Sequence, residues 1–185
     1  MNKAVLLDRD GTVIKEKPGV YLASPRGVKL YKNTLKALAL FKKAGFKIFI
    51  VSNQSGVGRG YFGKAEVEAV NAKMLRLLSK AAKVQAVYYC PHAPDTPCGC
   101  RKPAPQMGLD IIKKYKIDAA RSFVVGDKKS DIDFSRNIGM QSVLVLTGNG
   151  RAQQKKYGKN LGAGKVCADI YYAAKHIGKV LCKNI

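Results

Sequence analysis

The stretch Ala4-Val5-Leu6-Leu7-Asp8-Arg9-Asp10-Gly11-Thr12 decides the fold and places the first functional groups. Its four apolar residues predict a buried strand, and Gly11 ends that strand. Ligands of an open α/β sheet bind at the carboxyl ends of its strands, so Asp8 and Asp10 are expected at the mouth of a crevice. Two close carboxylates repel one another unless a cation neutralises them, which favours Mg²⁺. A solvent-exposed Asp-Gly turn is the alternative that this stretch leaves open.

The overall charge of the chain is strongly positive. With 34 Lys and Arg against 12 Asp and Glu, the 185 residues carry a net charge of +22. This balance favours anionic partners, but the lysines are scattered along the chain, and solvent-exposed lysines explain the charge better. Five of the 12 acids fall in two short clusters, Asp8/Asp10 and Asp127/Asp131/Asp133. Carboxylates gathered in so basic a chain indicate a metal site.

The sequence also bears on compartment and redox state. Its apolar runs stay well short of the ~20 residues that span a bilayer, and Met1-Asn2-Lys3 leads straight into a strand without the shape of a signal peptide. We therefore expect a cytoplasmic protein with no membrane partner. Three of the five Cys lie between residues 90 and 100, and in a reducing compartment such a cluster favours a metal over disulfides.

The rest of the chain alternates strands and helices, which predicts an α/β fold: a Rossmann-like, doubly wound parallel sheet with helices on both faces. The expected strands cover residues 46–51, 84–89, 122–125 and 142–146, and the expected helices cover 33–44, 64–83, 107–115, 132–138 and 168–181. Residues 13–30 are expected to form a loop over the crevice, and residues 147–164 are expected to form a loop with a short helix. With no repeat or boundary, residues 1–185 are expected to form a single domain without an inserted cap.

Two further strand ends carry polar loops. Ser52-Asn53-Gln54-Ser55-Gly56-Val57-Gly58 follows the strand at 46–51, and its small polar residues and glycines can cradle a phosphate with backbone N–H groups. Gly126-Asp127-Lys128-Lys129-Ser130-Asp131 follows the strand at 122–125 and places another acid where a shared Mg²⁺ requires one. Each stretch taken alone is more typical of an ordinary turn, but its place directly after a predicted strand favours a role in the site.

A cluster of metal-binding side chains follows the strand at 84–89. Cys90, His92, Cys98 and Cys100 lie within eleven residues and offer the sulfur and nitrogen ligands that tetrahedral Zn²⁺ prefers. Because all four ligands come from the protein, the predicted site is closed and structural. Arg101 and Lys102 follow directly, so a bound metal would place both cations at the crevice.

These motifs, in this order, resemble those of the haloacid dehalogenase superfamily. The resemblance implies that Asp8 is the nucleophile that attacks phosphorus and that Asp10 is the general acid and base. It implies that Lys102 stabilises the phosphoryl charge and that Asp131 has an orienting role. The implied Mg²⁺ ligands are Asp8, Asp127 and the backbone carbonyl of Asp10, and the implied contacts to the phosphoryl group and substrate include Ser52, Asn53, Gln54 and Ser55.

A narrower resemblance rests on Gly58-Arg59-Gly60-Tyr61-Phe62 and on the zinc loop, C-x-H-x₅-C-x-C-R-K-P. Both are similar to the heptose bisphosphate phosphatases and their histidinol phosphatase relatives, although Gln106 replaces the Gly usual there. This implies a monomeric Mg²⁺-dependent phosphatase that removes the 7-phosphate of D-glycero-D-manno-heptose 1,7-bisphosphate through an aspartyl phosphate. Arg101 and Lys128 would contact this small phosphorylated sugar, and histidinol phosphate is the rival substrate.

An alternative from another class is a zinc-stabilised module that binds nucleic acid. The charge of +22 and the Cys/His cluster motivate it. Stacking aromatic residues do not accompany the basic residues near the cluster, and the separated carboxylate motifs would have no role. We therefore expect no nucleic-acid partner.

Overall fold

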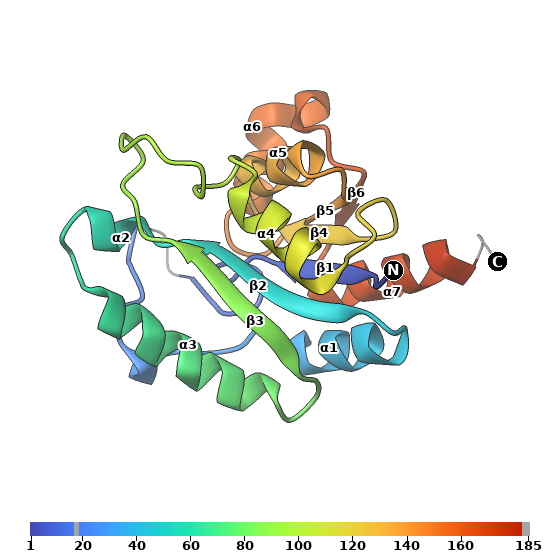
Figure 1. Ribbon diagram of the computed structural model, residues 1–185, viewed down its shortest axis with the longest axis horizontal. Coiled ribbons are helices and arrows are strands. Elements are labelled where there is room, and N and C mark those ends of the chain that lie inside the picture. The colour runs from blue at the N-terminus through green and yellow to red at the C-terminus, as the bar shows by residue number, and fades with distance from the viewer. Residues whose placement is uncertain (17–18, 183–185) are drawn as a thin grey trace.

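The computed structural model describes residues 1–16 and 19–182, which form a central sheet between two layers of helices (Figure 1). Within this described part of the chain, six strands pair in the order β3-β2-β1-β4-β5-β6, and each neighbouring pair is parallel. The strands are β1 (Ala4–Leu7), β2 (Lys47–Asn53), β3 (Val84–Cys90), β4 (Phe123–Gly126), β5 (Gln141–Val145) and β6 (Lys165–Cys167).

The strand order creates one switch point at the middle of the sheet. From β1 the chain runs outward to β2 and β3, and then returns to β4 on the other side of β1. Connections therefore leave β1 and β4 in opposite directions, and the carboxyl ends of this pair form the switch point at which such sheets bind ligands. Asp8 directly follows β1 and Asp127 directly follows β4. The backbone N–H of Asp8 donates to the Val125 carbonyl over 2.9 Å, so the two strands are held in register at this point.

Helices cover both faces of the sheet, and successive side chains of β1 point alternately to the two faces. Val5 and Leu7 pack into an apolar cluster with residues of α1, α3 and α7. Ala4 and Leu6 pack into a second cluster with residues of α4 and α5. Figure 1 shows α4 and α5 on the face of the sheet opposite α1 and α3. The helices are α1 (Thr34–Lys43), α2 (Ser55–Gly58), α3 (Lys64–Leu78), α4 (Gln106–Tyr115), α5 (Lys129–Asn137), α6 (Gly150–Tyr157) and α7 (Ile170–Cys182), with the 3₁₀ turns η1 (Pro25–Gly27) and η2 (Gly158–Leu161).

The expected fold class is confirmed, and the differences are local. The strand β6 was not expected, because it has only three residues and begins with a lysine. The helix α3 ends at Leu78 instead of residue 83, because the Leu78 carbonyl accepts from the N–H groups of Ala81 and Ala82 and closes a turn there. The strand β2 extends through Ser52 and Asn53, so these side chains are held by the sheet. Among the described residues, no helix has the length and hydropathy needed to cross a bilayer.

Candidate active site

A buried group of carboxylates lies at the switch point. Asp8, Asp127 and Asp131 each offer an oxygen within 4.8 Å of the others. In the described part of the chain, Oδ2 of Asp8 and Oδ1 of Asp127 are buried and have no hydrogen-bond partner. Both oxygens of Asp131 are already engaged, one by Lys102 and one by the backbone N–H of Lys128. The carboxylate oxygens of Asp8 and Asp127 are the ligand type that an oxygen-binding cation such as Mg²⁺ prefers.

The buried cation of this centre is Lys102. Its ammonium donates to Oδ1 of Asp8 over 2.7 Å, to Oδ1 of Asp131 over 2.6 Å and to the Val51 carbonyl over 2.7 Å. Burial by itself would lower the pKa of Lys102, but the Asp131 and Asp8 carboxylates outweigh it and raise that pKa. All three N–H donors are therefore used, and the group stays charged beside Asp8.

The protonation of Asp8 depends on this surrounding charge. Burial raises the pKa of Asp8 to about 8, Lys102 opposes the shift, and the neighbouring Asp131 and Asp127 add to it. Burial likewise raises the pKa of Asp127 to about 6. The Lys102 and Lys128 ammonium groups therefore do not fully offset the burial of these two carboxylates. A divalent cation bound between Asp8 and Asp127 would restore the ionised state of both.

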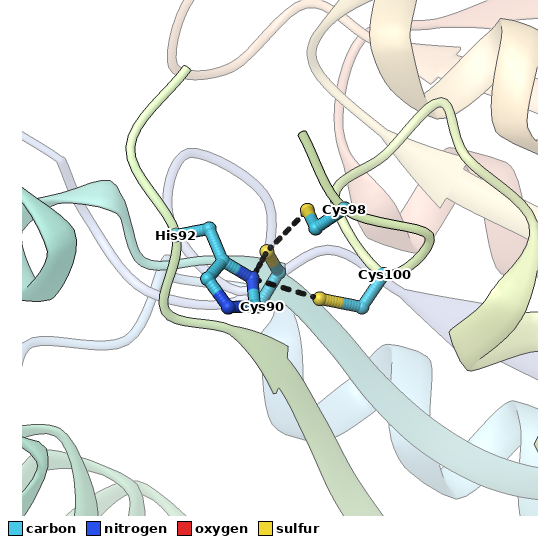
Figure 2. A group of neighbouring side chains, drawn as sticks. All are labelled: Cys90, His92, Cys98 and Cys100. Carbon is cyan, nitrogen blue, oxygen red and sulfur yellow. Dashed lines mark hydrogen bonds between the residues drawn. The ribbon is translucent and has the colours of Figure 1, made fainter. Parts of the chain in front are cut away.

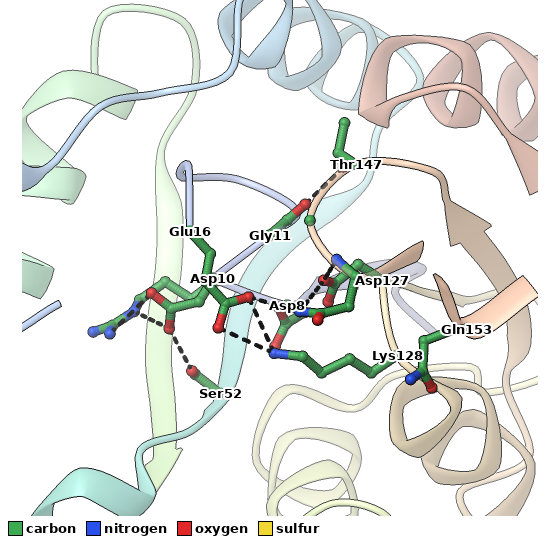
Figure 3. A network of polar contacts seen from close by, with 12 residues as sticks. Asp8, Asp10, Gly11, Glu16, Ser52, Asp127, Lys128, Thr147 and Gln153 are labelled. Atoms are coloured by element: carbon green, nitrogen blue, oxygen red, sulfur yellow. Dashed lines mark hydrogen bonds and ion pairs between the residues drawn. The ribbon is translucent and has the colours of Figure 1, made fainter. Parts of the chain in front are cut away.

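Glycines bring the backbone close to Asp127. Gly11 has φ +95°, and a Cβ built there would collide with the Asp127 carboxylate. A Cβ at Gly148 would collide with the same carboxylate, so both positions require glycine. Thr147 donates its hydroxyl to the Gly11 carbonyl over 2.6 Å, and the backbone N–H of Asn149 donates to Oδ2 of Asp127 over 2.7 Å. The loop after β5 thereby closes this side of the site, as Figure 3 shows.

The side chain of Asp10 turns away from Asp127 and toward the loop after β2 (Figure 3). Its Oδ2 accepts from Gln54 Nε2 over 2.7 Å and from Arg9 Nε over 2.9 Å, and Ser52 Oγ lies 3.5 Å away. Gln54 Nε2 also donates to Ser52 Oγ over 2.7 Å. The predicted substrate residues Ser52 and Gln54 therefore lie beside Asp10, and their contact with a substrate stays a prediction.

Asn53 joins the loop after β2 to the segment that carries Lys102. Its Nδ2 donates to the Lys102 carbonyl over 3.0 Å, and its Oδ1 accepts from the Lys102 N–H over 3.0 Å. This reciprocal pair fixes the backbone from which the Lys102 side chain enters the centre. Ser55 begins α2, and its hydroxyl lies 3.3 Å from the Tyr21 hydroxyl, so residues of the segment 13–30 reach this rim.

A second set of charged groups lies around Lys128, across the site from the loop after β2. Lys128 Nζ lies 3.3 Å from Glu16, and Asn149 Nδ2 donates to Glu16 over 3.0 Å (Figure 3). Burial would lower the pKa of Lys128, but the nearby carboxylates, led by Asp8 and Asp127, raise it. Glu16 belongs to the loop expected over the crevice, and the structure places it there, while Lys17 and Pro18 lie outside the described residues. Arg101 lies beside the Cys/His loop, with Nη1 3.4 Å from the His92 carbonyl.

The predicted zinc ligands converge in the structure (Figure 2). His92 Nδ1 lies 3.4 Å from Cys90 Sγ and 3.3 Å from Cys100 Sγ, and Cys90 Sγ lies 3.7 Å from Cys98 Sγ. A tetrahedral Zn²⁺ with its usual bond lengths has ligand-to-ligand edges of roughly 3.3–3.8 Å, so the four atoms fit such an ion. Burial would raise the pKa of Cys98, but hydrogen bonds, first that from the Arg101 N–H, lower it to about 7. Burial raises the pKa of Cys90 to about 12 and also raises the pKa of Cys100, so Cys98 is the thiol of the three that ionises most readily.

Some residues of the site were not predicted. Asn149 follows β5, so the strand-end argument used for Asp8 and Asp127 could have found it. No role was predicted for Arg9, which lies between Asp8 and Asp10 in the sequence, yet its side chain is among the largest that are fully buried. Asn71 is a polar residue on the buried side of α3, where the apolar pattern was assigned to the core.

Comparisons with known proteins agree with this architecture. Residues 99–173 match the HAD-hydrolase-like family model. The D-glycero-beta-D-manno-heptose-1,7-bisphosphate 7-phosphatase of Bordetella bronchiseptica is 36% identical over 176 residues, which cover 95% of this chain and 97% of the relative. The probable D-glycero-D-manno-heptose-1,7-bisphosphate 7-phosphatase of Thermoplasma volcanium is 38% identical over 145 residues, which cover 77% of this chain and 98% of that protein.

A solved structure shows the same fold with ligands bound. The D,D-heptose 1,7-bisphosphate phosphatase of B. bronchiseptica, in complex with magnesium and phosphate, superposes with a TM-score of 0.87. The superposition covers 99% of each chain at 35% sequence identity. The chain therefore belongs to the family of HAD-like hydrolases that includes these heptose bisphosphate phosphatases.

Proposed function

We propose that the chain is a Mg²⁺-dependent phosphatase that removes the 7-phosphate of D-glycero-D-manno-heptose 1,7-bisphosphate. The observation that carries the proposal is the state of Asp8. This carboxylate is buried at the switch point, one oxygen is held by Lys102, and the other has no partner in the described part of the chain. A nucleophile needs such a free, oriented oxygen. The relative from B. bronchiseptica, which covers nearly the whole chain, bears the name of this activity.

The proposed reaction proceeds in two steps on residues of this chain. The free oxygen of Asp8 attacks the 7-phosphorus and forms an aspartyl phosphate, while the bond from phosphorus to the sugar oxygen breaks. Asp10 gives its proton to the leaving oxygen. Asp10 then takes a proton from water, which attacks the phosphorus of the aspartyl phosphate and releases phosphate and Asp8. Lys102 and the loop after β2 neutralise and orient the phosphoryl oxygens.

Two metals are part of the proposal. Asp8, Asp127 and the backbone carbonyl of Asp10 would hold Mg²⁺, which when bound supplies positive charge to the transferring phosphoryl group. Its support is the unpartnered Oδ1 of Asp127 and the grouping of the Asp8, Asp127 and Asp131 carboxylates within 4.8 Å of one another. Cys90, His92, Cys98 and Cys100 would hold a structural Zn²⁺, supported by their tetrahedral spacing. That ion would keep Arg101 and Lys102 in place, because both follow the last ligand directly.

The choice of substrate depends on groups beyond the transferred phosphate. Arg101 and Lys128 are the cations that we assign to a second phosphate; Lys128 lies beside Glu16 and Arg101 beside the Cys/His loop, which supports the assignment. A bisphosphate offers them a dianion, whereas histidinol phosphate offers an ammonium that they would repel. The pairing of Lys128 with Glu16 holds this cation at the crevice until a phosphate replaces the carboxylate.

The test compares kcat/KM for heptose 1,7-bisphosphate and histidinol phosphate at the same Mg²⁺ concentration. We expect a preference of roughly a hundredfold for the bisphosphate, since each ~1.4 kcal/mol is a factor of ten. Arg101→Ala should reduce this preference, whereas the control Arg121→Ala, at an exposed position, should leave it unchanged. Equal or better use of histidinol phosphate would refute the heptose assignment. No hydrolysis of either ester, together with tight, steeply salt-dependent binding of DNA, would favour the nucleic-acid module instead.

A further inference from the structure

A buried arginine stands between the two acids of the first motif, and the reaction just described gives it no role. The Arg9 side chain is 1% exposed. Among the described residues, the carboxylate of Asp10 is the one acidic group that it contacts in an ion pair. A buried guanidinium is costly unless its donors are satisfied, so its partners show what the fold uses it for.

Arg9 holds both oxygens of the Asp10 carboxylate. Its Nε donates to Oδ2 over 2.9 Å, and its Nη2 donates to Oδ1 over 3.2 Å. This is the paired arrangement in which the flat guanidinium matches a carboxylate and fixes its plane. The orientation of Asp10 is therefore set by the orientation of Arg9.

The other side of the guanidinium is held as well. Nη1 donates to Oδ1 of Asn71 over 2.9 Å, and Nη2 donates to Oε1 of Gln54 over 2.7 Å. Gln54 in turn donates to Asp10 over 2.7 Å, which closes a ring of three side chains. Asn71 comes from α3 and lies 62 positions away from Arg9 in the chain. It joins a helix of the covering layer to this ring.

The placement of Asn71 has no other explanation in the core. Its neighbours on the buried side of α3 are the fully buried Val67, Val70 and Met74. An amide at such a position is unfavourable unless it is hydrogen-bonded, and Arg9 is the partner that the structure gives it.

We propose that Arg9 is a positioning residue for Asp10, and that Asn71 supports Arg9 from α3. The inference rests on the proposed function, because it concerns the proton that Asp10 delivers to the leaving oxygen. A general acid must lie within hydrogen-bond reach of that oxygen, and a small misplacement costs rate. With Asn71 removed, the guanidinium loses its outer contact and the carboxylate plane is no longer fixed.

The leaving group makes this role measurable. An alkoxide such as the sugar oxygen needs a proton to depart, whereas nitrophenolate is a stable anion that departs without one. Since kcat/KM covers the steps up to formation of the aspartyl phosphate, misplacing the acid should lower kcat/KM for the sugar phosphate and spare that for p-nitrophenyl phosphate. The ratio of the two values on one preparation is independent of the fraction of folded enzyme.

The experiment measures this ratio with heptose 1,7-bisphosphate and p-nitrophenyl phosphate at saturating Mg²⁺. In Asn71→Leu we expect the ratio to fall by about tenfold, a part of the 10²–10⁴-fold typical of a general acid. Arg9→Lys, which keeps the charge and loses the two-pronged contact, should lower the ratio as well. Val70→Ala, which removes a buried side chain from the same helix, should lower stability and leave the ratio unchanged.

Each contrary result has a distinct meaning. A ratio unchanged in Asn71→Leu would overturn the role of Asn71, and a ratio unchanged in Arg9→Lys would overturn positioning through the paired contact. An equal fall in Val70→Ala would show that the ratio reports general loosening of α3, which also refutes the proposal. Failure of the proposed function is recognised separately on the parent chain, which would then hydrolyse heptose 1,7-bisphosphate no better than histidinol phosphate, or not at all.

Discussion

Lys102 Nζ lies 2.7 Å from Oδ1 of Asp8, although 94 positions separate the two residues. The pair joins the end of β1 to the segment that follows the Cys/His loop, and it is buried on both sides. Because two carboxylates and one backbone carbonyl share this ammonium, Lys102 stabilises the closely packed acids and leaves one oxygen of Asp8 free.

Replacing Lys102 with Met should therefore affect both stability and catalysis. The substitution keeps the unbranched apolar stem of the side chain but leaves Asp8 and Asp131 buried without their cation, an effect worth about 3 kcal/mol of unfolding free energy. Urea denaturation in Mg²⁺-free buffer measures this loss. The control is Lys64→Met, at an exposed position at the start of α3. Equal stability of the two variants would mean that Lys102 does not balance these acids.

Stabilisation by Mg²⁺ should increase with pH. Burial raises the pKa of Asp8 to about 8, so the folded state holds this proton more tightly than the unfolded chain does. In the metal-free protein, the protonated Asp8 contributes to folding stability. This contribution is complete below the pKa of Asp8 in the unfolded chain, and it is lost as the pH rises through about 8, the pKa of Asp8 in the folded state. Mg²⁺ binds the ionised carboxylate, so the increase in Tm of the protein on addition of Mg²⁺ should be larger at about pH 8 than at about pH 6. Asp127→Asn should abolish most of this gain, and a gain independent of pH would contradict the account.

Loss of one cysteine from the Cys/His cluster should lower activity, because Arg101 and Lys102 directly follow the last cysteine of the cluster. Cys98→Ser is expected to reduce the metal content from about one Zn²⁺ per chain, to lower Tm, and to lower kcat/KM by loosening Arg101 and Lys102. The matched control is Cys167→Ser, which changes a buried cysteine outside the cluster. Elemental analysis and kinetics on the same samples check this. Purified, unchelated parent protein without zinc and with freely titrating thiols would refute the structural site.

The residues that follow the strands could be predicted from the sequence, because the carboxyl ends of parallel strands lie at the same edge of the sheet. Apolar runs located β1 and β4, and the acids that follow them had to meet if the strands were neighbours. Lys102 could be placed because it follows the cluster of Cys and His directly. Asn71 could not, because its role depends on how α3 packs over the sheet, which no local pattern specifies. The strand β6 was missed since three residues with a lysine carry no periodicity.

We propose Asp8 as the nucleophile of the reaction, and the Asp8→Asn variant is the sharpest test of that role. Asn is nearly the same shape but cannot form an aspartyl phosphate, so the fold should remain and the turnover of heptose 1,7-bisphosphate should fall at least about a thousandfold, ~4 kcal/mol of transition-state stabilisation. Asp110→Asn, at an exposed acid on α4, is the control and should retain full turnover. A turnover of Asp8→Asn within about tenfold of the parent, a loss of only ~1.4 kcal/mol, would contradict the account.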